Sequence, residues 1–288
     1  MTIIKTKHLT EKQRLEIEEL LLSCQACSAE TLFFPIEDGD LFYLLFTKEG
    51  TLGCAAALTF FSDISEPGSD SEENSSDSSG DEDIKTYRDM ENTDYAECTA
   101  FTRPSLRHMG YFSSVFEILS QEIEDIDLYF PVSRPDKATL SALASLEAVH
   151  DRDEYKMEFS IDRDKKETFQ SEAERLTPVW STEEDGSLLL QFYLKENNQM
   201  QRGPAGSCRL SVSGDSACFY AFEIKESLRG QGLGRDALLL TLSLLSENQR
   251  VSGCKKLFLH VSQLNEAAVS LYKKTGFHIS EILSYYLY

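Results

Sequence analysis

Residues 216–249 read SACFYAFEIKESLRGQGLGRDALLLTLSLLSENQ. The first part, 217–224, is apolar and aromatic, as is typical of a buried strand, and the leucine-rich part, 236–245, predicts a helix packed against a core. Between them, glycines stand at 230, 232 and 234. Without Cβ atoms, the backbone N–H groups at the mouth of a helix can point outward together, and a phosphate can approach them closely. The stretch therefore predicts a strand, a pyrophosphate-binding turn and a helix.

Two common phosphate-binding loops do not fit this turn. A dinucleotide-binding loop has the spacing Gly-x-Gly-x-x-Gly and an acidic residue at the end of the next strand. Here the spacing is Arg229-x-x-Gly232-x-Gly234, and the next predicted strand, 256–261, ends without an acid. A Walker loop requires Gly-Lys-Ser/Thr, which is absent from the turn.

A second stretch, 261–277, reads VSQLNEAAVSLYKKTGF. Its pattern is Asn265-x-x-Ala268-x-x-Leu271-Tyr272-x-x-x-Gly276-Phe277. The turn and this pattern resemble the two acyl-CoA motifs of the GCN5-related N-acetyltransferases (GNAT), in the family's order and at its usual separation. The resemblance is strong over about 185–288 and weaker elsewhere. It implies an α/β fold with a mixed, mostly antiparallel sheet flanked by helices.

The resemblance implies an enzyme, an acetyl-CoA-dependent N-acetyltransferase in which an amine attacks the thioester directly. Acetyl-CoA is the expected co-substrate, and no metal is expected. In the family, the strand before the loop exposes backbone groups to pantetheine, and the loop amides hold the pyrophosphate. The residues expected to bind the cofactor are Phe222, Ile224, Arg229, Gly230, Gln231, Gly232, Leu233, Gly234 and Asn265.

Tyr272 matches the tyrosine that commonly protonates the CoA sulfur in this family. The alternative is an aromatic on the inner face of an amphipathic helix, beside Leu271. A phenol with a pKa near 10 stays protonated at neutral pH, which suits an acid. We therefore expect Tyr272 to be the general acid.

The general base is left open by the sequence. The carboxylate that the family often places eleven residues before the loop is Cys218 here. Glu223 is the candidate, although alternation puts it on the opposite face from Cys218 and Tyr220 unless a bulge intervenes. A carboxylate within an apolar strand is costly unless it is paired. Water-mediated deprotonation is an equal alternative, and His260 is expected to be a core histidine.

The N-terminal half resembles a second, degenerate copy. Arg107-x-x-Gly110-x-Phe112 aligns with the loop at an offset of 122, and 132–136 aligns with 261–265 at an offset of 129. Phe112 stands where the loop has Gly234, and we expect its side chain to obstruct a pyrophosphate. We therefore expect two tandem GNAT-like domains, with cofactor bound only by the C-terminal one.

The predicted domains are a degenerate copy at 1–161, a linker at 162–175 and a catalytic domain at 176–288. Within the first, 62–84 is acidic and serine-rich with almost no apolar residue, which predicts a disordered loop. The net charge of −21 is uneven: residues 171–288 carry 12 basic and 13 acidic side chains, and 1–170 carry 16 and 36. Solubility is the expected role of this charge.

Composition restricts the partners. An acidic surface repels nucleic acid and anionic membranes, and no apolar run is long enough to cross a membrane. The N-terminus turns polar too early for a signal peptide. Seven scattered cysteines predict reduced thiols and a cytoplasmic location. We expect a small-molecule or peptide amine acceptor, while the sequence leaves the oligomeric state open.

The missing carboxylate at Cys218 motivates a second hypothesis, a catalytically inactive CoA-binding or scaffold protein. Both hypotheses require the same cofactor loop, so the loop does not distinguish them. Turnover of acetyl-CoA by the purified protein distinguishes the two hypotheses.

Overall fold

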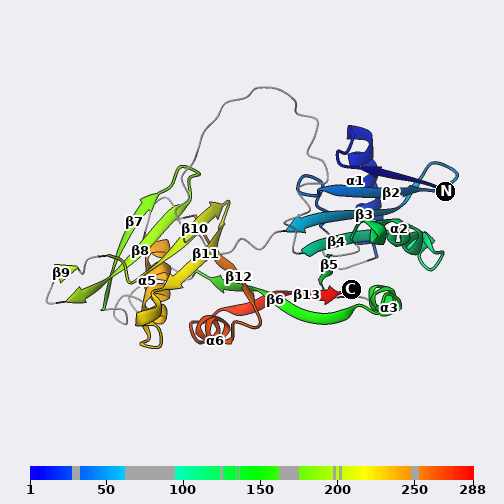
Figure 1. Ribbon diagram of the computed structural model, residues 1–288. Coiled ribbons are helices and arrows are strands. Elements are labelled where there is room, and N and C mark those ends of the chain that lie inside the picture. Colours follow the sequence, from blue (N-terminus) through cyan, green and yellow to red (C-terminus); the bar gives the residue numbers. More distant parts are fainter. Residues whose placement is uncertain are drawn as a thin grey trace, which may run out of the picture. The chain divides into compact units, whose positions relative to one another are not determined.

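The computed structural model describes residues 1–27, 33–61, 95–123, 126–133, 135, 137–161, 175–196, 199–200, 203–247 and 253–288 (Figure 1). The predicted disordered loop, 62–84, lies outside these residues. The predicted linker lies outside them as well, except for Arg175.

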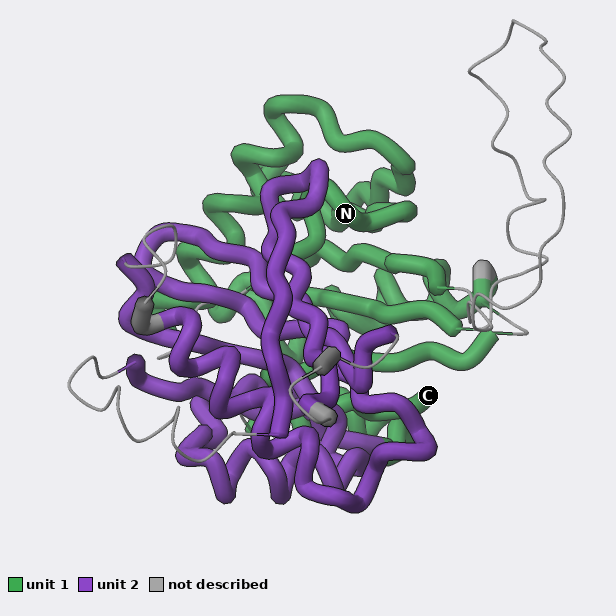
Figure 2. The backbone as a smooth tube through the Cα atoms, turned by 90° about the vertical axis from the view of Figure 1, so that its left-hand side faces the viewer, with its two compact units in different colours: residues 1–151, 285–288 green, residues 152–284 purple. Residues whose placement is uncertain are grey.

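The described chain forms two compact units, coloured separately in Figure 2. Unit 1 comprises Met1–Asp151 and Tyr285–Tyr288, and unit 2 comprises Arg152–Ser284. This division differs from the predicted linker, because strand β6 (Val149–Ser160) pairs with β12 (Lys256–Ser262) along its whole second half. The last strand of the N-terminal repeat therefore contributes mostly to the sheet of unit 2.

Unit 1 is a sheet in the order β1-β2-β3-β4-β5, antiparallel except between β4 and β5. Its last four residues come from the end of β13, where the Tyr288 N–H donates to the Leu128 carbonyl at 2.9 Å. The elements are β1 (Thr2–Thr6), α1 (Glu11–Gln25), β2 (Leu41–Phe46), β3 (Leu52–Phe61), β4 (Tyr95–Thr102), α2 (Tyr111–Leu119), β5 (Asp127–Ser133) and α3 (Lys137–Ser145).

The apolar sequence of β2 reflects burial on both faces of the unit 1 sheet. Phe42 packs in one cluster with Ile17 of α1, and its neighbour Tyr43 packs in another with Val115 of α2. Successive side chains of a strand point to opposite faces. Helices α1 and α2 therefore cover opposite faces of this sheet.

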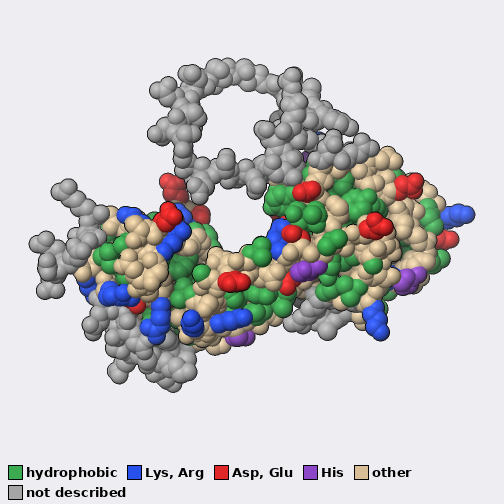
Figure 3. Space-filling view, turned by 60° about the horizontal axis from the view of Figure 1, so that its bottom comes forward, with side chains coloured by type: hydrophobic (Ala, Val, Ile, Leu, Met, Phe, Trp, Pro, Cys, Tyr) green, Lys and Arg blue, Asp and Glu red, His purple; other side chains and the backbone are tan. Residues whose placement is uncertain are grey.

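Unit 2 is a sheet in the order β13-β6-β12-β11-β10-β8-β7, with β9 paired to β8. Its further elements are β7 (Leu176–Thr182), β8 (Leu188–Glu196), β9 (Gln199–Met200), β10 (Gly206–Ser213), β11 (Ser216–Ile224), α5 (Leu233–Glu247), α6 (Glu266–Lys274) and β13 (His278–Leu287). Side chains of α5 and α6 belong to one core cluster. Among the described residues of unit 2, no helix packs on the other face, which we call the open face. Figure 3 shows several Lys and Arg side chains (blue) close together on this unit, at the left.

The predicted repeat is confirmed in the backbone of the two units. Strand β4 ends at Thr102 and β11 ends at Ile224, an offset of 122. A single 3₁₀ turn follows each strand, and α2 and α5 then begin at Tyr111 and Leu233, again 122 apart.

Two left-handed residues recur at this offset. In unit 2 they are Gly230 (φ 74°) and Gly232 (φ 80°), and in unit 1 they are His108 (φ 61°) and Gly110 (φ 80°). Unit 1 therefore keeps the path of the loop although a side chain replaces one of its glycines. Histidine adopts this conformation more readily than most non-glycine residues, and β-branched residues do so least.

We predict that His108→Val lowers the free energy of unfolding by about 1–2 kcal/mol, because a β-branched residue is strained at this φ. The neighbouring and exposed Met109 is the matched control, and Met109→Val should cost far less. Urea denaturation of both variants measures the difference. Equal losses would contradict the left-handed assignment.

Candidate active site

Strands β11 and β12 separate at the centre of unit 2. They pair in parallel only from Ser216↔Lys256 to Cys218↔Phe258. Strand β11 continues to Ile224 and β12 continues to Ser262, beyond this pairing. Backbone N–H and C=O groups that lose a ladder partner need another partner. The diverging strands therefore offer backbone hydrogen bonds to an extended ligand.

A β-bulge lies in the diverging part of β11. Opposite β10, Arg209 pairs with Tyr220 and Ser207 pairs with Glu223, so β11 carries one extra residue. Ala221 takes up the bulge with a left-handed φ of 48°. Such bulges re-aim side chains and are common beside active sites.

The bulge changes which face Glu223 occupies. Phe219 is buried in the core, and Phe222 packs against the same core. Tyr220 and Glu223 are exposed and lie on the open face. Without a bulge, strand alternation would put Glu223 and Tyr220 on opposite faces. The bulge is present, and it places Glu223 on the same face as Tyr220.

Glu223 is not a buried carboxylate, contrary to the concern raised by its apolar strand. It is exposed, and its Oε1 accepts a hydrogen bond from the Ser207 hydroxyl at 3.2 Å. Water and one hydroxyl therefore solvate the carboxylate, which faces away from the core.

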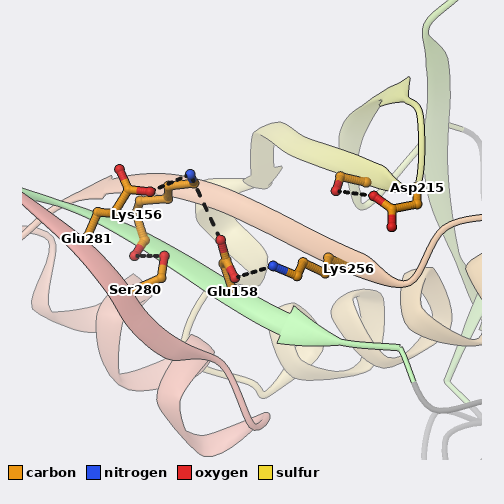
Figure 4. Close-up of polar contacts among 7 residues, drawn as sticks. Lys156, Glu158, Asp215, Lys256, Ser280 and Glu281 are labelled. Carbon is orange, nitrogen blue, oxygen red and sulfur yellow. Dashed lines mark hydrogen bonds and ion pairs between the residues drawn. The ribbon is translucent and has the colours of Figure 1, made fainter. Parts of the chain in front are cut away.

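Charged side chains continue along the open face, across β12, β6 and β13 (Figure 4). The Lys156 ammonium lies 2.8 Å from Glu281 and 3.9 Å from Glu158, and Lys256 lies 3.5 Å from Glu158. The prediction that His260 is a core residue is wrong. It is exposed, because Leu257, Leu259 and Val261 take the core positions of β12 and leave the alternate position to the open face.

The glycine loop enters α5 through two left-handed residues, Gly230 and Gly232. A Cβ added at Gly230 would meet no atom within 4 Å, so this side of the loop is open space. The Gly232 carbonyl accepts the Arg235 N–H at 3.1 Å and so starts the helix. The start of an α-helix leaves backbone N–H groups without a partner in the helix, and these favour anions.

Gly234 has a different reason to be glycine from the one the sequence suggested. Its φ is not left-handed, and an added Cβ would lie 3.4 Å from Leu271 and 3.9 Å from both Ile224 and Phe222. A side chain here therefore points at α6 and the end of β11, and a large one would push them away. It would not project from the open side of the loop.

The remaining loop side chains hold the loop in place. The Arg229 Nε donates to the Ile224 carbonyl at 3.0 Å, just as the Arg107 Nε donates to the Thr102 carbonyl at 3.4 Å in unit 1. The Leu233 side chain is buried in the core, and the Gln231 amide donates to the Ser227 carbonyl at 3.4 Å. The Leu233 side chain is therefore directed into the core, and only the backbone of this residue is available at the loop.

Asn265 is the N-cap of α6, where its Oδ1 accepts the Ala268 N–H at 3.1 Å. A capping asparagine stabilises a helix by roughly 0.5–2 kcal/mol compared with alanine. This bond accounts for the residue type at 265. Its amide nitrogen is at the exposed end of the helix, close in sequence to the end of β12.

Tyr272 lies in the core below the diverging strands, with a side chain that is only 6% exposed. Its ring centroid is 6.3 Å from that of Phe219 and 5.7 Å from that of Phe277. Burial, with a smaller contribution from Cys208, raises the pKa of Tyr272 to about 12. Tyr272 therefore holds its proton throughout the neutral range.

One charged residue at the loop was missed by sequence reasoning. Arg175 immediately precedes β7, and its guanidinium contacts both Asp236 and the Gln231 carbonyl. Nothing in its sequence surroundings indicates this, because the partners lie 61 and 56 residues away. Among the described residues, no group of three or more His, Cys, Asp or Glu could hold a metal ion, and no helix is long and apolar enough to span a membrane.

Residues 152–277 match the model of the acetyltransferase (GNAT) family. This part of the chain belongs to the GNAT family. The match covers the diverging strands, the glycine loop and Tyr272, and nearly all of unit 2. An uncharacterised N-acetyltransferase, YdgE of Bacillus subtilis (strain 168), is 41% identical over 66 residues. That alignment spans 23% of this chain and 40% of YdgE, less than half of the relative's length.

Solved GNAT structures resemble the whole chain. A GCN5-related N-acetyltransferase from Sphaerobacter thermophilus has a TM-score of 0.62 at 11% identity, and the alignment covers 99% of this chain and 95% of that one. A tandem GNAT protein from the clavulanic acid biosynthesis pathway has a TM-score of 0.61 at 10% identity, with coverage of 100% and 98%. At these identities the likeness concerns the fold, and it extends the GNAT fold over both halves of the chain.

We predict that the phenol of Tyr272 titrates near pH 12, because burial disfavours its charged form. Carbon NMR of protein labelled at the tyrosine Cζ atoms measures this midpoint. The Tyr272 signal is identified as the one that is present in the wild-type spectrum and missing from the spectrum of Tyr272→Phe. That signal should titrate later than an ordinary tyrosine. A midpoint at the ordinary tyrosine value near 10 would contradict the burial of the hydroxyl.

Proposed function

We propose that this protein transfers an acyl group, with acetyl the default, from acyl-CoA to an amine by direct attack of the amine on the thioester. The observation that carries the proposal is the combination in unit 2 of two diverging parallel strands with an open glycine loop at the start of α5. The strands suit an extended pantetheine arm, and the loop suits a diphosphate.

Acyl-CoA would supply an activated thioester, and the chain's residues would bind and orient it. The backbone of Phe222 and Ile224, on the diverging strand, would bind pantetheine. The amides from Gly230 to Gly234 would bind the pyrophosphate, and Arg229 would keep the strand and loop in register through its bond to the Ile224 carbonyl. The amide nitrogen of Asn265 would contact the cofactor from the start of α6.

Tyr272 is the proposed general acid. It lies on the core side of the diverging strands, beside Phe219, and keeps its proton at neutral pH. Its hydroxyl would donate that proton to the sulfur as the C–S bond breaks. Positioned acid catalysis typically contributes about 10²- to 10⁴-fold.

Glu223 is the proposed base, acting on the amine from the open face. The bulge at Ala221 supports this role, because it turns Glu223 to the face that carries no helix of unit 2 among the described residues. Cys218 is a poor substitute, because burial raises the pKa of its thiol. Deprotonation by water alone is the alternative mechanism. The acceptor class is a small-molecule or peptide amine.

A catalytically inactive CoA-binding protein is the alternative function. The thiol of Cys218 at the usual carboxylate position favours it. Release of CoA thiol by purified protein, over a panel of primary amines, separates the two. Thiol release that depends on the amine supports the enzyme, and tight CoA binding without release on any amine supports the alternative.

Tyr272→Phe should lower kcat by roughly 10²- to 10⁴-fold and leave CoA affinity and melting temperature nearly unchanged, because the ring still packs. Tyr193→Phe is the matched control, since the Tyr193 hydroxyl bonds only to Gln191 among the described residues. Steady-state kinetics and calorimetry provide the values. Full kcat in Tyr272→Phe would remove Tyr272 from the mechanism, and a large loss of stability would make its hydroxyl structural.

A further inference from the structure

We propose that Arg175 positions the glycine loop for the diphosphate of the acyl donor and balances the charge of Asp236 beside it. The inference rests on the proposed function. It concerns a residue outside the two sequence motifs, which immediately precedes β7.

The Arg175 guanidinium bridges the loop and the first turn of α5. Its Nε donates to Asp236 Oδ2 at 2.7 Å, and its Nη1 donates to the Gln231 carbonyl at 2.7 Å. The backbone at 175 is fixed as well, because its carbonyl accepts the Lys195 N–H at 2.9 Å. A planar fork with two bonds fixes direction as well as distance.

The carboxylate of Asp236 makes this bridge necessary for binding an anion. Its side chain is only 5% exposed and lies in the first turn of the helix, where a diphosphate would bind. A buried carboxylate without a partner is costly, and its charge would repel a neighbouring phosphate. Arg175 supplies the opposite charge directly.

The guanidinium also lies against the turn itself. A Cβ added at Gly232 would be 3.1 Å from Arg175 Nη2. The Arg175 side chain is 51% exposed, and Nη2 has no hydrogen-bond partner in the described part of the chain. One face of the group therefore holds the loop, and the other remains open to an anion.

Unit 1 shows that a turn of this shape folds without an ion pair like that of Arg175 and Asp236. It keeps the same left-handed path through His108 and Gly110, yet Ser114 stands at the position equivalent to Asp236. The Arg175–Asp236 pair thus has no counterpart there. Because the turn forms in unit 1 without this pair, the bridge in unit 2 is not a requirement for the turn to fold.

The test compares two donors, acetyl-CoA and S-acetylpantetheine, which lacks the diphosphate. Arg175→Ala should raise the Kd for CoA and the KM for acetyl-CoA roughly 10- to 100-fold, with kcat nearly unchanged. Its kcat/KM for S-acetylpantetheine should match that of the wild type. Arg14→Ala, which removes an exposed cation paired with Glu37 in unit 1, is the control and should alter neither donor.

Arg175→Ala combined with Asp236→Asn removes the unpaired carboxylate in case the single variant does not fold. It should still bind CoA weakly, because the bond to the Gln231 carbonyl is lost. Wild-type affinity for CoA in either variant would overturn the inference, and so would an equal loss of kcat/KM for the two donors. If wild-type protein binds no CoA, the proposed function fails first, which distinguishes the two failures.

Discussion

The candidate site depends on the early end of the pairing between β11 and β12. After Cys218↔Phe258 the two strands diverge, and the backbone of β11 from Phe219 to Ile224 is no longer paired with β12. The Arg229 bond to the Ile224 carbonyl then fixes the end of the diverging strand against the loop. The glycine loop and the start of α5 come directly after this diverging strand in the chain.

The two units share this construction but differ in their residues. In unit 1, β4 and β5 also pair over only three residues, and Arg107 bonds to the end of β4. Unit 1 covers its sheet on both faces with α1 and α2, whereas unit 2 has an open face that carries Glu223. The backbone is thus common to both, and the chemistry is concentrated in unit 2.

Local patterns predicted much of the fold. The strand at 217–224, the helix at 236–245 and the strand at 256–261 predicted from the sequence correspond to β11, α5 and β12, and motif spacing indicated the repeat. Strands β7 and β13 were missed, because their sequences lack clear alternation and their place depends on distant strands. The bulge at Ala221 was unpredictable because it arises from register against β10. Arg175 was missed for the same reason, since only tertiary structure brings it to Asp236.

We infer that one unit, and not both, forms a complete site for an acyl donor. Equilibrium dialysis of purified full-length protein against labelled CoA measures this directly as the number of molecules bound per chain at saturation. We predict a stoichiometry of one, because His108 in unit 1 places a side chain on the side of the loop that Gly230 leaves open in unit 2. A stoichiometry of two, or none, would contradict this assignment of the site.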